Sequence, residues 1–277
     1  MNNQLQEVCN VSQVQKYWNE RPCNVRHSHR TVGTREYFDD VEKRRYFVEP
    51  HIVGFADFPF WEGKRVLEIG CGIGTDSINF AKAGADLTVF DLSDKSLELC
   101  KKRFKVFGLS ANFVSGNVER LDEYLEPQTF DLIYSFGVLH HTPNPQAALA
   151  QLRKYMNQQS ELRIMLYSRW SWKSLAIWFR YGYKYGWSLN KVVPKYSEAQ
   201  SGCPVTYTYS FKEARKLLQG FYINAIWKDH IFPYRIKDYV NYTYVWEWYF
   251  RYLPKRMFSR LKSLLGWHTL IKARLSS

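Results

Sequence analysis

Short apolar runs alternate with amphipathic stretches between residues 64 and 167, and this pattern predicts a parallel sheet with helices on both faces. The alternation then stops, and two further strands are predicted nearer the end of the chain. The last of them places apolar and polar residues with a period of two. We therefore expect an α/β protein with a doubly wound, mostly parallel sheet of seven strands whose last strand is antiparallel. The predicted strands are 66–69, 86–91, 112–115, 130–135, 162–167, 221–227 and 267–275.

Capping residues mark the ends of the predicted helices. Ser93 precedes an apolar stripe at helical spacing, and Gly108 ends it. Asn144 and Pro145 have the residue types of an N-cap and a first helical position, so a helix is predicted from there to about residue 156. A capping box at Ser210 predicts another helix, which ends near residue 220.

This pattern divides the chain into four segments. Residues 1–60 are expected to form an N-terminal cap and residues 61–167 the core. Residues 168–209 are expected to be an insertion that covers a substrate, as a lid. Residues 210–277 return to the sheet, with an aromatic-rich helical insertion at about 235–266.

Composition excludes several classes of protein. The chain has 277 residues, of which 45% are hydrophobic and 23% charged, so it is not a disordered chain. No run reaches the roughly 18 to 20 apolar residues that span a bilayer, and the first residues lack the pattern of a signal peptide. The five cysteines form no C-x-x-C pair, which favours reduced thiols. We expect a cytoplasmic protein.

The net charge of +13 is unevenly distributed. Residues 168–277 carry 19 basic and 5 acidic side chains, and 8 of the 10 tryptophans. Three interpretations of this basic, aromatic part stay open: packing on the core with a solvated face, peripheral contact with a membrane surface, and binding of RNA. No RNA-binding module is found, so contact with nucleic acid is not expected.

A glycine-rich turn follows the first predicted strand and precedes a helix. It reads Gly70-Cys71-Gly72-Ile73-Gly74. Glycines at alternate positions let the chain turn sharply and let a ligand approach the main-chain N–H groups. A dinucleotide fingerprint requires a further glycine at position 75, where this chain has Thr75, so a nicotinamide cofactor is disfavoured.

The turn, together with Glu68, resembles the E-x-G-x-G-x-G motif of class I S-adenosylmethionine-dependent methyltransferases, which have a Rossmann-like fold. The segment 136–143 is also similar to the motif that follows the fourth strand in their small-molecule members. The resemblance implies S-adenosylmethionine (SAM) as cofactor and transfer of its methyl group to an O, N or S atom of a small-molecule acceptor. The cofactor-binding residues that it implies are Glu68, Gly70, Gly72, Gly74, Asp91, Leu92, Asn117, Val118, Ser135, Phe136 and Gly137.

Two of these positions carry alternatives. Asp91 ends the second strand, where a carboxylate either accepts the ribose hydroxyls or caps a helix. Asn117 stands where the family commonly has an aspartate that contacts the adenine amino group. Its side-chain oxygen can accept the same hydrogen bond, and an ordinary turn residue is the equal alternative.

His140 and His141 are the candidates for a general base, because they follow the fourth strand at the edge where such sheets bind ligands. The alternative is that they bond only to the backbone at the start of a helix. No metal site is expected, since adjacent histidines do not share a helical face.

Aromatic and arginine residues outside the core are candidates for acceptor binding. Aromatic faces stabilise a sulfonium and arginine holds an anion, although amphipathic packing accounts for each residue equally well. Trp18 and Arg45 belong to the same group of cap residues. The predicted substrate-binding residues are Tyr17, Arg21, Tyr37, Arg44, Tyr207 and Tyr209.

The predicted function is therefore SAM-dependent methylation of a small molecule. The alternatives are an RNA methyltransferase that uses the basic part, another SAM-dependent transfer or a cyclisation, and a SAM-binding scaffold without turnover. The oligomeric state does not follow from the sequence.

Overall fold

The computed structural model describes residues 10–197 and 203–276. Predictions that concern residues 1–9, including the lack of a signal peptide, and the part of the lid at 198–202 lie outside the described residues. Seven strands form one sheet in the order β3-β2-β1-β4-β5-β7-β6. Strands β1 to β5 pair in parallel, and β7 pairs antiparallel with both β5 and β6. The predicted fold class is confirmed. The strands are β1 (Arg65–Ile69), β2 (Asp86–Asp91), β3 (Asn112–Ser115), β4 (Leu132–Phe136), β5 (Glu161–Tyr167), β6 (Phe221–Asp229) and β7 (His268–Leu275).

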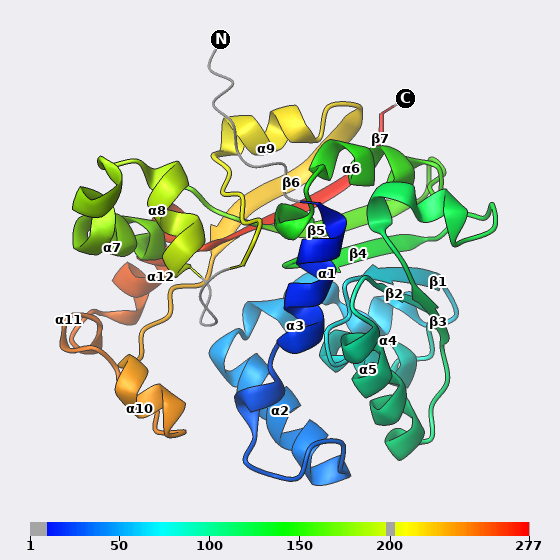
Figure 1. Cartoon of the computed structure of the whole chain (residues 1–277), viewed down its shortest axis with the longest axis horizontal. Helices are drawn as coiled ribbons and strands as arrows, with labels where there is room; N and C mark the ends of the chain where they lie inside the picture. The colour runs from blue at the N-terminus through cyan, green and yellow to red at the C-terminus, as the bar shows by residue number, and fades with distance from the viewer. Residues whose placement is uncertain (1–9, 198–202, 277) are drawn as a thin grey trace.

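Helices cover both faces of the sheet. Figure 1 shows α6 (Pro145–Arg153) and α9 (Phe211–Leu217) on one side and α4 (Thr75–Lys82) and α5 (Asp94–Phe107) on the other. Each layer buries its apolar stripe in a separate cluster: Leu149 and Leu217 belong to one, and Phe80 and Phe104 to the other. Burial on both faces explains why the strands read as continuous apolar runs.

The predicted caps are present. The Ser93 side chain accepts a hydrogen bond from the Ser96 amide, Gly108 ends α5 with φ +68°, and both hydrogen bonds of the Ser210 capping box are made. Two helix ends differ from the prediction: α9 ends at Leu217 and not near residue 220, and α6 ends at Arg153 and not near residue 156. A turn in which the side chains of residues 157 and 160 bond to the backbone follows and redirects the chain into β5.

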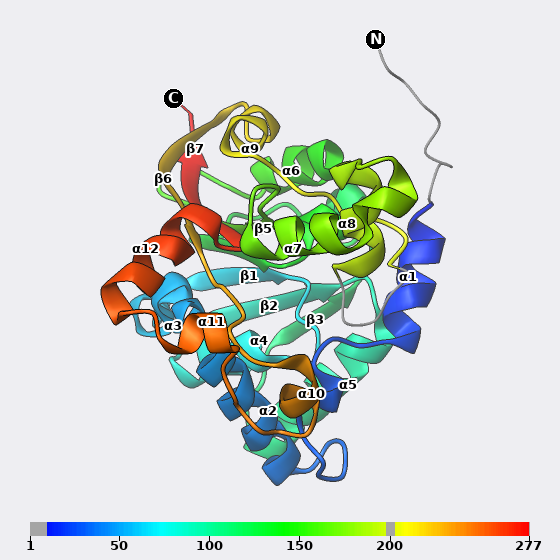
Figure 2. The same cartoon turned by 90° about the vertical axis from the view of Figure 1, so that its left-hand side faces the viewer.

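Most of the remaining helices lie at the edge of the sheet where the parallel strands end, whereas α3 (His51–Ala56) packs on the face that α4 and α5 cover, with Phe55 in the same buried cluster as Phe80. The N-terminal segment forms α1 (Val11–Glu20), α2 (Arg35–Val48) and α3, and the insertion after β5 forms α7 (Trp172–Tyr181) and α8 (Leu189–Tyr196). Because β7 is antiparallel, the insertion between β6 and β7 begins and ends at this same edge, and Figure 2 shows both insertions in front of the sheet. Its helices are α10 (Ile236–Val240), α11 (Trp248–Arg251) and α12 (Lys255–Leu265).

The aromatic, basic part is only partly packed on the core. Trp267 and Val192 are buried between α7, α8 and the sheet. By contrast, α12 has no buried residue, and Trp248 and Tyr252 are 73% and 79% exposed. Core packing therefore explains only part of this region: Phe250 of α11 is buried, whereas Met257 and Leu264 of α12 are exposed. Among the described residues, no helix is both long and apolar enough to cross a bilayer.

Candidate functional site

A cavity of about 260 Å³ lies at the carboxyl ends of the central strands. The ends of β1, β2, β4 and β5 contribute to its wall, and so does the start of β7. This is the edge at which open α/β sheets bind ligands. Helix α1 and the chain that follows it line the outer side of the cavity, with Trp18, Cys23 and Asn24.

The glycine turn forms one wall of the cavity. Gly70, Gly72 and Gly74 all have positive φ angles, of 78°, 52° and 74°. A Cβ at Gly70 would lie 2.1 Å from the Val138 side chain, and one at Gly74 would lie 2.5 Å from Cys100 Sγ. Gly70 and Gly74 are therefore needed for packing as well as for the turn. A Cβ at Gly72 would meet no atom nearer than 3.7 Å, so this residue faces open cavity.

Asp91 connects the turn to β2. Its Oδ2 accepts a hydrogen bond from the Gly72 amide at 3.0 Å, and its Oδ1 accepts one from the Ser93 amide at 2.8 Å. Burial raises its pKa to about 6, although these bonds act in the opposite direction. The amide and the thiol of Cys71 also act on this carboxylate, which lines the cavity and can share its acceptor positions with a ligand.

Glu68 is a buried acid in the same wall. No hydrogen bond reaches its Oε2, and burial raises its pKa to about 8, with the neighbouring Asp76 adding to the effect. Asp76, by contrast, already accepts hydrogen bonds from Arg45, Tyr46 and Tyr134. The cavity thus contains a carboxyl oxygen that a cationic group of a ligand would satisfy.

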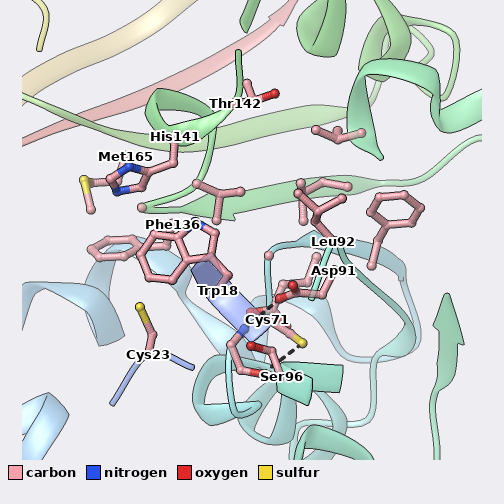
Figure 3. A pocket seen from close by; sticks show the side chains of 18 of the residues that line it. Trp18, Cys23, Cys71, Asp91, Leu92, Ser96, Phe136, His141, Thr142 and Met165 are labelled. Carbon is pink, nitrogen blue, oxygen red and sulfur yellow. Dashed lines mark hydrogen bonds between the residues drawn. The ribbon is translucent and has the colours of Figure 1, made fainter. Parts of the chain in front are cut away.

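Helix α1 covers the end of the cavity at Asp91 and Leu92. Gln15 donates to the Leu92 carbonyl at 3.1 Å, and the Ser93 hydroxyl donates to Asn19 at 2.8 Å. These bonds hold Trp18 over the cavity. In Figure 3, Asp91 and Leu92 lie toward one side, and His141, Met165 and Phe136 gather on the other.

The structure separates the two adjacent histidines. His141 lines the cavity, and its Nδ1 lies 2.8 Å from the Val205 carbonyl oxygen. A carbonyl only accepts, so Nδ1 carries the proton and Nε2 is the basic nitrogen. His140 is fully buried, with its ring 3.7 Å from that of Tyr167, and burial holds its pKa well below the usual range.

Most of the predicted cofactor residues meet at this cavity. Asn117 lines it, while its side-chain oxygen also accepts from the Glu119 amide, as in an ordinary turn. Gly74 and Ser135 do not line it: Gly74 begins α4, and Ser135 is buried in β4. The predicted site residues that line the cavity are Glu68, Gly70, Gly72, Asp91, Leu92, Asn117, Val118, Phe136, Gly137 and His141.

The structure does not bring the predicted acceptor residues of the N-terminal segment to the cavity. Tyr37 is fully buried and donates to the Val25 carbonyl, and Arg44 donates to the Tyr239 carbonyl at 2.7 Å. Arg21 is exposed and lies over the Tyr17 ring. For Tyr17 and Arg44, helix periodicity turns the neighbouring residue inward. Trp18 and Arg45 line the cavity instead.

The two tyrosines of the lid are also outside the lining. The Tyr207 hydroxyl donates to the Pro143 carbonyl at 3.2 Å, and its amide donates to His140. Tyr209 pairs with Ser168 in an isolated bridge and packs on the core. Tyr207 thus joins the insertion after β5 to the loop after β4, whereas Tyr209 joins it to the end of β5.

Several lining residues carried no signal in the sequence. They come from segments that are far apart in the chain and share no motif: Cys23, Asn24, Glu49, Met165, Tyr167 and His268. A histidine as the first residue of an apolar strand was the one local hint, at His268.

Comparisons with known proteins agree with this geometry. Residues 66–159 match the family model described as a methyltransferase domain. The ubiquinone biosynthesis O-methyltransferase of Photorhabdus laumondii is 36% identical over 95 residues, which are 33% of this chain and 39% of that protein. The enzyme of the same name from Dechloromonas aromatica is 38% identical over 87 residues, 31% of this chain and 37% of that protein. The chain thus spans about two fifths of the length of the curated relatives it matches.

Solved structures extend the likeness to nearly the whole chain. The magnesium protoporphyrin IX methyltransferase of Synechocystis PCC 6803, solved with bound S-adenosylhomocysteine (SAH), has a TM-score of 0.60 and 16% identity. The match covers 96% of this chain and 100% of that chain. The mitomycin 7-O-methyltransferase has a TM-score of 0.53 and 14% identity over 87% of this chain and 57% of that chain. At such identities the match concerns the fold. Residues 66–159 of this chain therefore match a methyltransferase domain, and the seven-stranded sheet has the fold of the solved methyltransferases.

Proposed function

We propose that this protein transfers the methyl group of SAM to an O, N or S atom of a small-molecule acceptor, with a hydroxyl oxygen as the favoured atom. The observation that carries the proposal is one cavity in which the glycine turn and Asp91 face His141. The relatives named as O-methyltransferases support both the reaction and the acceptor atom.

The residues of the cavity fit SAM. The Asp91 carboxylate suits the two ribose hydroxyls, and Asn117 and Val118 line the same cavity for the base. The unpartnered oxygen of Glu68 suits the ammonium of the methionine end. When bound, SAM supplies an electrophilic methyl carbon on a sulfonium, which the ring of Trp18 would stabilise by about 0.5 to 2 kcal/mol.

The chain's own groups perform the remaining tasks. Hydrogen bonds to Leu92 and Ser93 hold α1 over the cavity, where its side chains would exclude water and keep the two reactants aligned. Alignment supplies up to roughly 7 to 11 kcal/mol in favourable cases. His141 Nε2 takes the proton of the acceptor hydroxyl, because the Val205 carbonyl holds the other nitrogen protonated. A general base of this kind contributes about 10²- to 10⁴-fold.

Purified protein incubated with methyl-labelled SAM and fractionated cell extract tests the proposal. We expect label in a low-molecular-weight product and at least a tenfold lower rate for His141→Gln. The affinity of that variant for SAH, measured by calorimetry, should stay within about threefold of the wild type. Label in RNA would favour an RNA methyltransferase instead. Binding of SAH without label in any fraction would indicate a SAM-binding scaffold without turnover.

We also propose peripheral contact with anionic membranes through α11 and α12, and a cytoplasmic location. The exposed rings of Trp248 and Tyr252 beside the basic helix α12 support the contact, since interfacial helices combine these groups. The described cysteines form no disulfide, which supports a reducing compartment.

Co-sedimentation with phosphatidylglycerol vesicles tests the contact. Trp248→Ser combined with Tyr252→Ser should reduce binding. Tyr222→Ser, which alters another exposed ring near the opposite end of β6, should not reduce it. Equal binding by all three proteins would contradict the contact.

A further inference from the structure

Three potential metal ligands converge beside the cavity. Side-chain ligand atoms of Glu49, His230 and His268 all lie within 4.8 Å of one another. His268 Nε2 and Glu49 Oε1 are 3.6 Å apart. Two ligands of a tetrahedral zinc ion, each about 2.1 Å from the metal, are separated by about 3.4 Å, so this pair is already near the required spacing.

The topology explains how residues so distant in sequence meet. His268 is the first residue of the antiparallel strand β7, and it pairs in register with Asp229 at the end of β6 and with Tyr167 at the end of β5. His230 follows β6 with φ +68°, a left-handed conformation that costs energy in a residue with a side chain. Glu49 caps the carboxyl end of α2, against the same edge.

Surrounding groups orient the ligands. His51 Nε2 and His268 Nδ1 are 2.9 Å apart, which holds the His268 ring with Nε2 toward Glu49. Arg45 Nε lies 4.0 Å from Glu49 Oε2, and Arg45 is held in turn by Asp76 at 3.1 Å. One carboxylate oxygen thus faces the arginine and the other faces the histidines. Protein metal sites commonly have such outer hydrogen bonds.

The two ligand imidazoles are suited to coordination. Both rings are buried, and burial favours the neutral form that binds metals. Glu49 and His268 line the cavity, and the His268 ring lies 5.4 Å from that of Phe136. Three protein ligands beside an open cavity leave a coordination position for a ligand from solvent or substrate.

We propose that Glu49, His230 and His268 bind one divalent transition-metal ion, with Zn²⁺ as the best match to the donor set, and that its open position receives an oxygen of the methyl acceptor. The second half of this proposal rests on the proposed methyl transfer, whereas metal binding does not. The acceptor class is then a hydroxyl compound, because a bound hydroxyl is acidified by the ion and becomes a better nucleophile.

Titration of the full chain with Co²⁺, after treatment with a chelator, tests the site. We expect one equivalent to bind, with a visible absorption band that reports coordination by nitrogen and oxygen, and competition by Zn²⁺. Glu49→Gln and His268→Gln should abolish the band. His51→Gln, which alters a positioning residue, should weaken binding by roughly 10- to 100-fold. His29→Gln changes an exposed histidine and should leave the titration unchanged.

The outcomes separate this proposal from methyl transfer. Absence of saturable Co²⁺ binding by the wild type, or equal binding by Glu49→Gln and His29→Gln, overturns the metal site even if methyl transfer is found. Should a variant fail to fold, X-ray absorption of the Co²⁺-loaded wild type still decides, since two imidazole ligands are required. Co²⁺ binding with no methyl transfer in any fraction would retain the site and remove the proposed function. Methyl transfer that persists undiminished after chelation, with Co²⁺ still bound on titration, overturns the role of the ion.

Discussion

Replacing Asp91 by alanine removes the acidic group on which the proposed cofactor binding most depends. The carboxylate accepts hydrogen bonds from the amides of Gly72 and Ser93, at 3.0 and 2.8 Å, and it lines the cavity, where ribose hydroxyls can donate to it. Each hydrogen bond to a charged group contributes about 1.5 to 3 kcal/mol. Two ribose bonds at the lower limit give about 3 kcal/mol, so the dissociation constant for SAH should rise by roughly 100-fold, and by at least about tenfold if water replaces part of the loss.

The same substitution should leave the ligand-free protein folded. Burial raises the pKa of Asp91 from 3.8 to about 6, so the ionised form is disfavoured in the native state. This destabilisation is complete above pH 6 and disappears as the pH falls toward 4; at pH 7.5 it amounts to roughly 3 kcal/mol. Removing the acid recovers that energy, which offsets the loss of two backbone hydrogen bonds.

Calorimetric titration with SAH at pH 7.5, together with thermal melting, measures both effects. Asp86→Asn is the matched control, because this exposed aspartate begins the strand that Asp91 ends. Unchanged SAH affinity in Asp91→Ala would refute its role in the site. A folded variant that loses affinity, with a control like the wild type, is the expected result.

Three further outcomes follow from the structure. SAH binding at pH 7 should release a proton, and the affinity for SAH should rise as the pH approaches 8. The reason is that the pKa of Glu68 without ligand is about 8 and a cationic ligand favours its ionised form. Calorimetry in two buffers should show no proton release in Glu68→Gln. Gly70→Ala should lower the free energy of unfolding, measured in urea, by about 1 to 3 kcal/mol more than Gly108→Ala does. Both residues have positive φ, but only a Cβ at Gly70 would meet a side chain. Equal losses in the two variants would contradict this packing argument. Glu42→Gln should lower the free energy of unfolding by about 3 kcal/mol in the same assay, because Arg103 is fully buried and its Nη2 lies 2.7 Å from Glu42 Oε2. A loss below about 1 kcal/mol would show that the ion pair is solvated.

Local chemistry made much of the core predictable. The glycine turn, the Ser93 cap and the apolar runs of the strands each act within a few residues, and the structure has them at or near the predicted positions. Residues that follow parallel strands were also predictable as neighbours, because those strands end at one edge. Gly72, Asp91 and His141 meet at one cavity for this reason.

Side chains on the helices outside the core were harder to place. The sequence pointed to Tyr17 and Arg44 as acceptor-binding residues, with Trp18 and Arg45 only as members of the same group, but the angle at which a helix docks decides which residue of a turn faces inward. Trp18 and Arg45 line the cavity as a result. The choice between His140 and His141 likewise depended on the insertion after β5, whose Val205 carbonyl orients one ring while the other is buried against Tyr167.

The sequence by itself determined the order of strands and helices, the turns between them and the kind of ligand that the glycine turn suits, since these depend on contacts between near neighbours in the chain. Only the tertiary structure decided that Glu49, His230 and His268 stand together. Their meeting depends on the reversed direction of β7 and on the docking of α2, and no short stretch of residues encodes either of these.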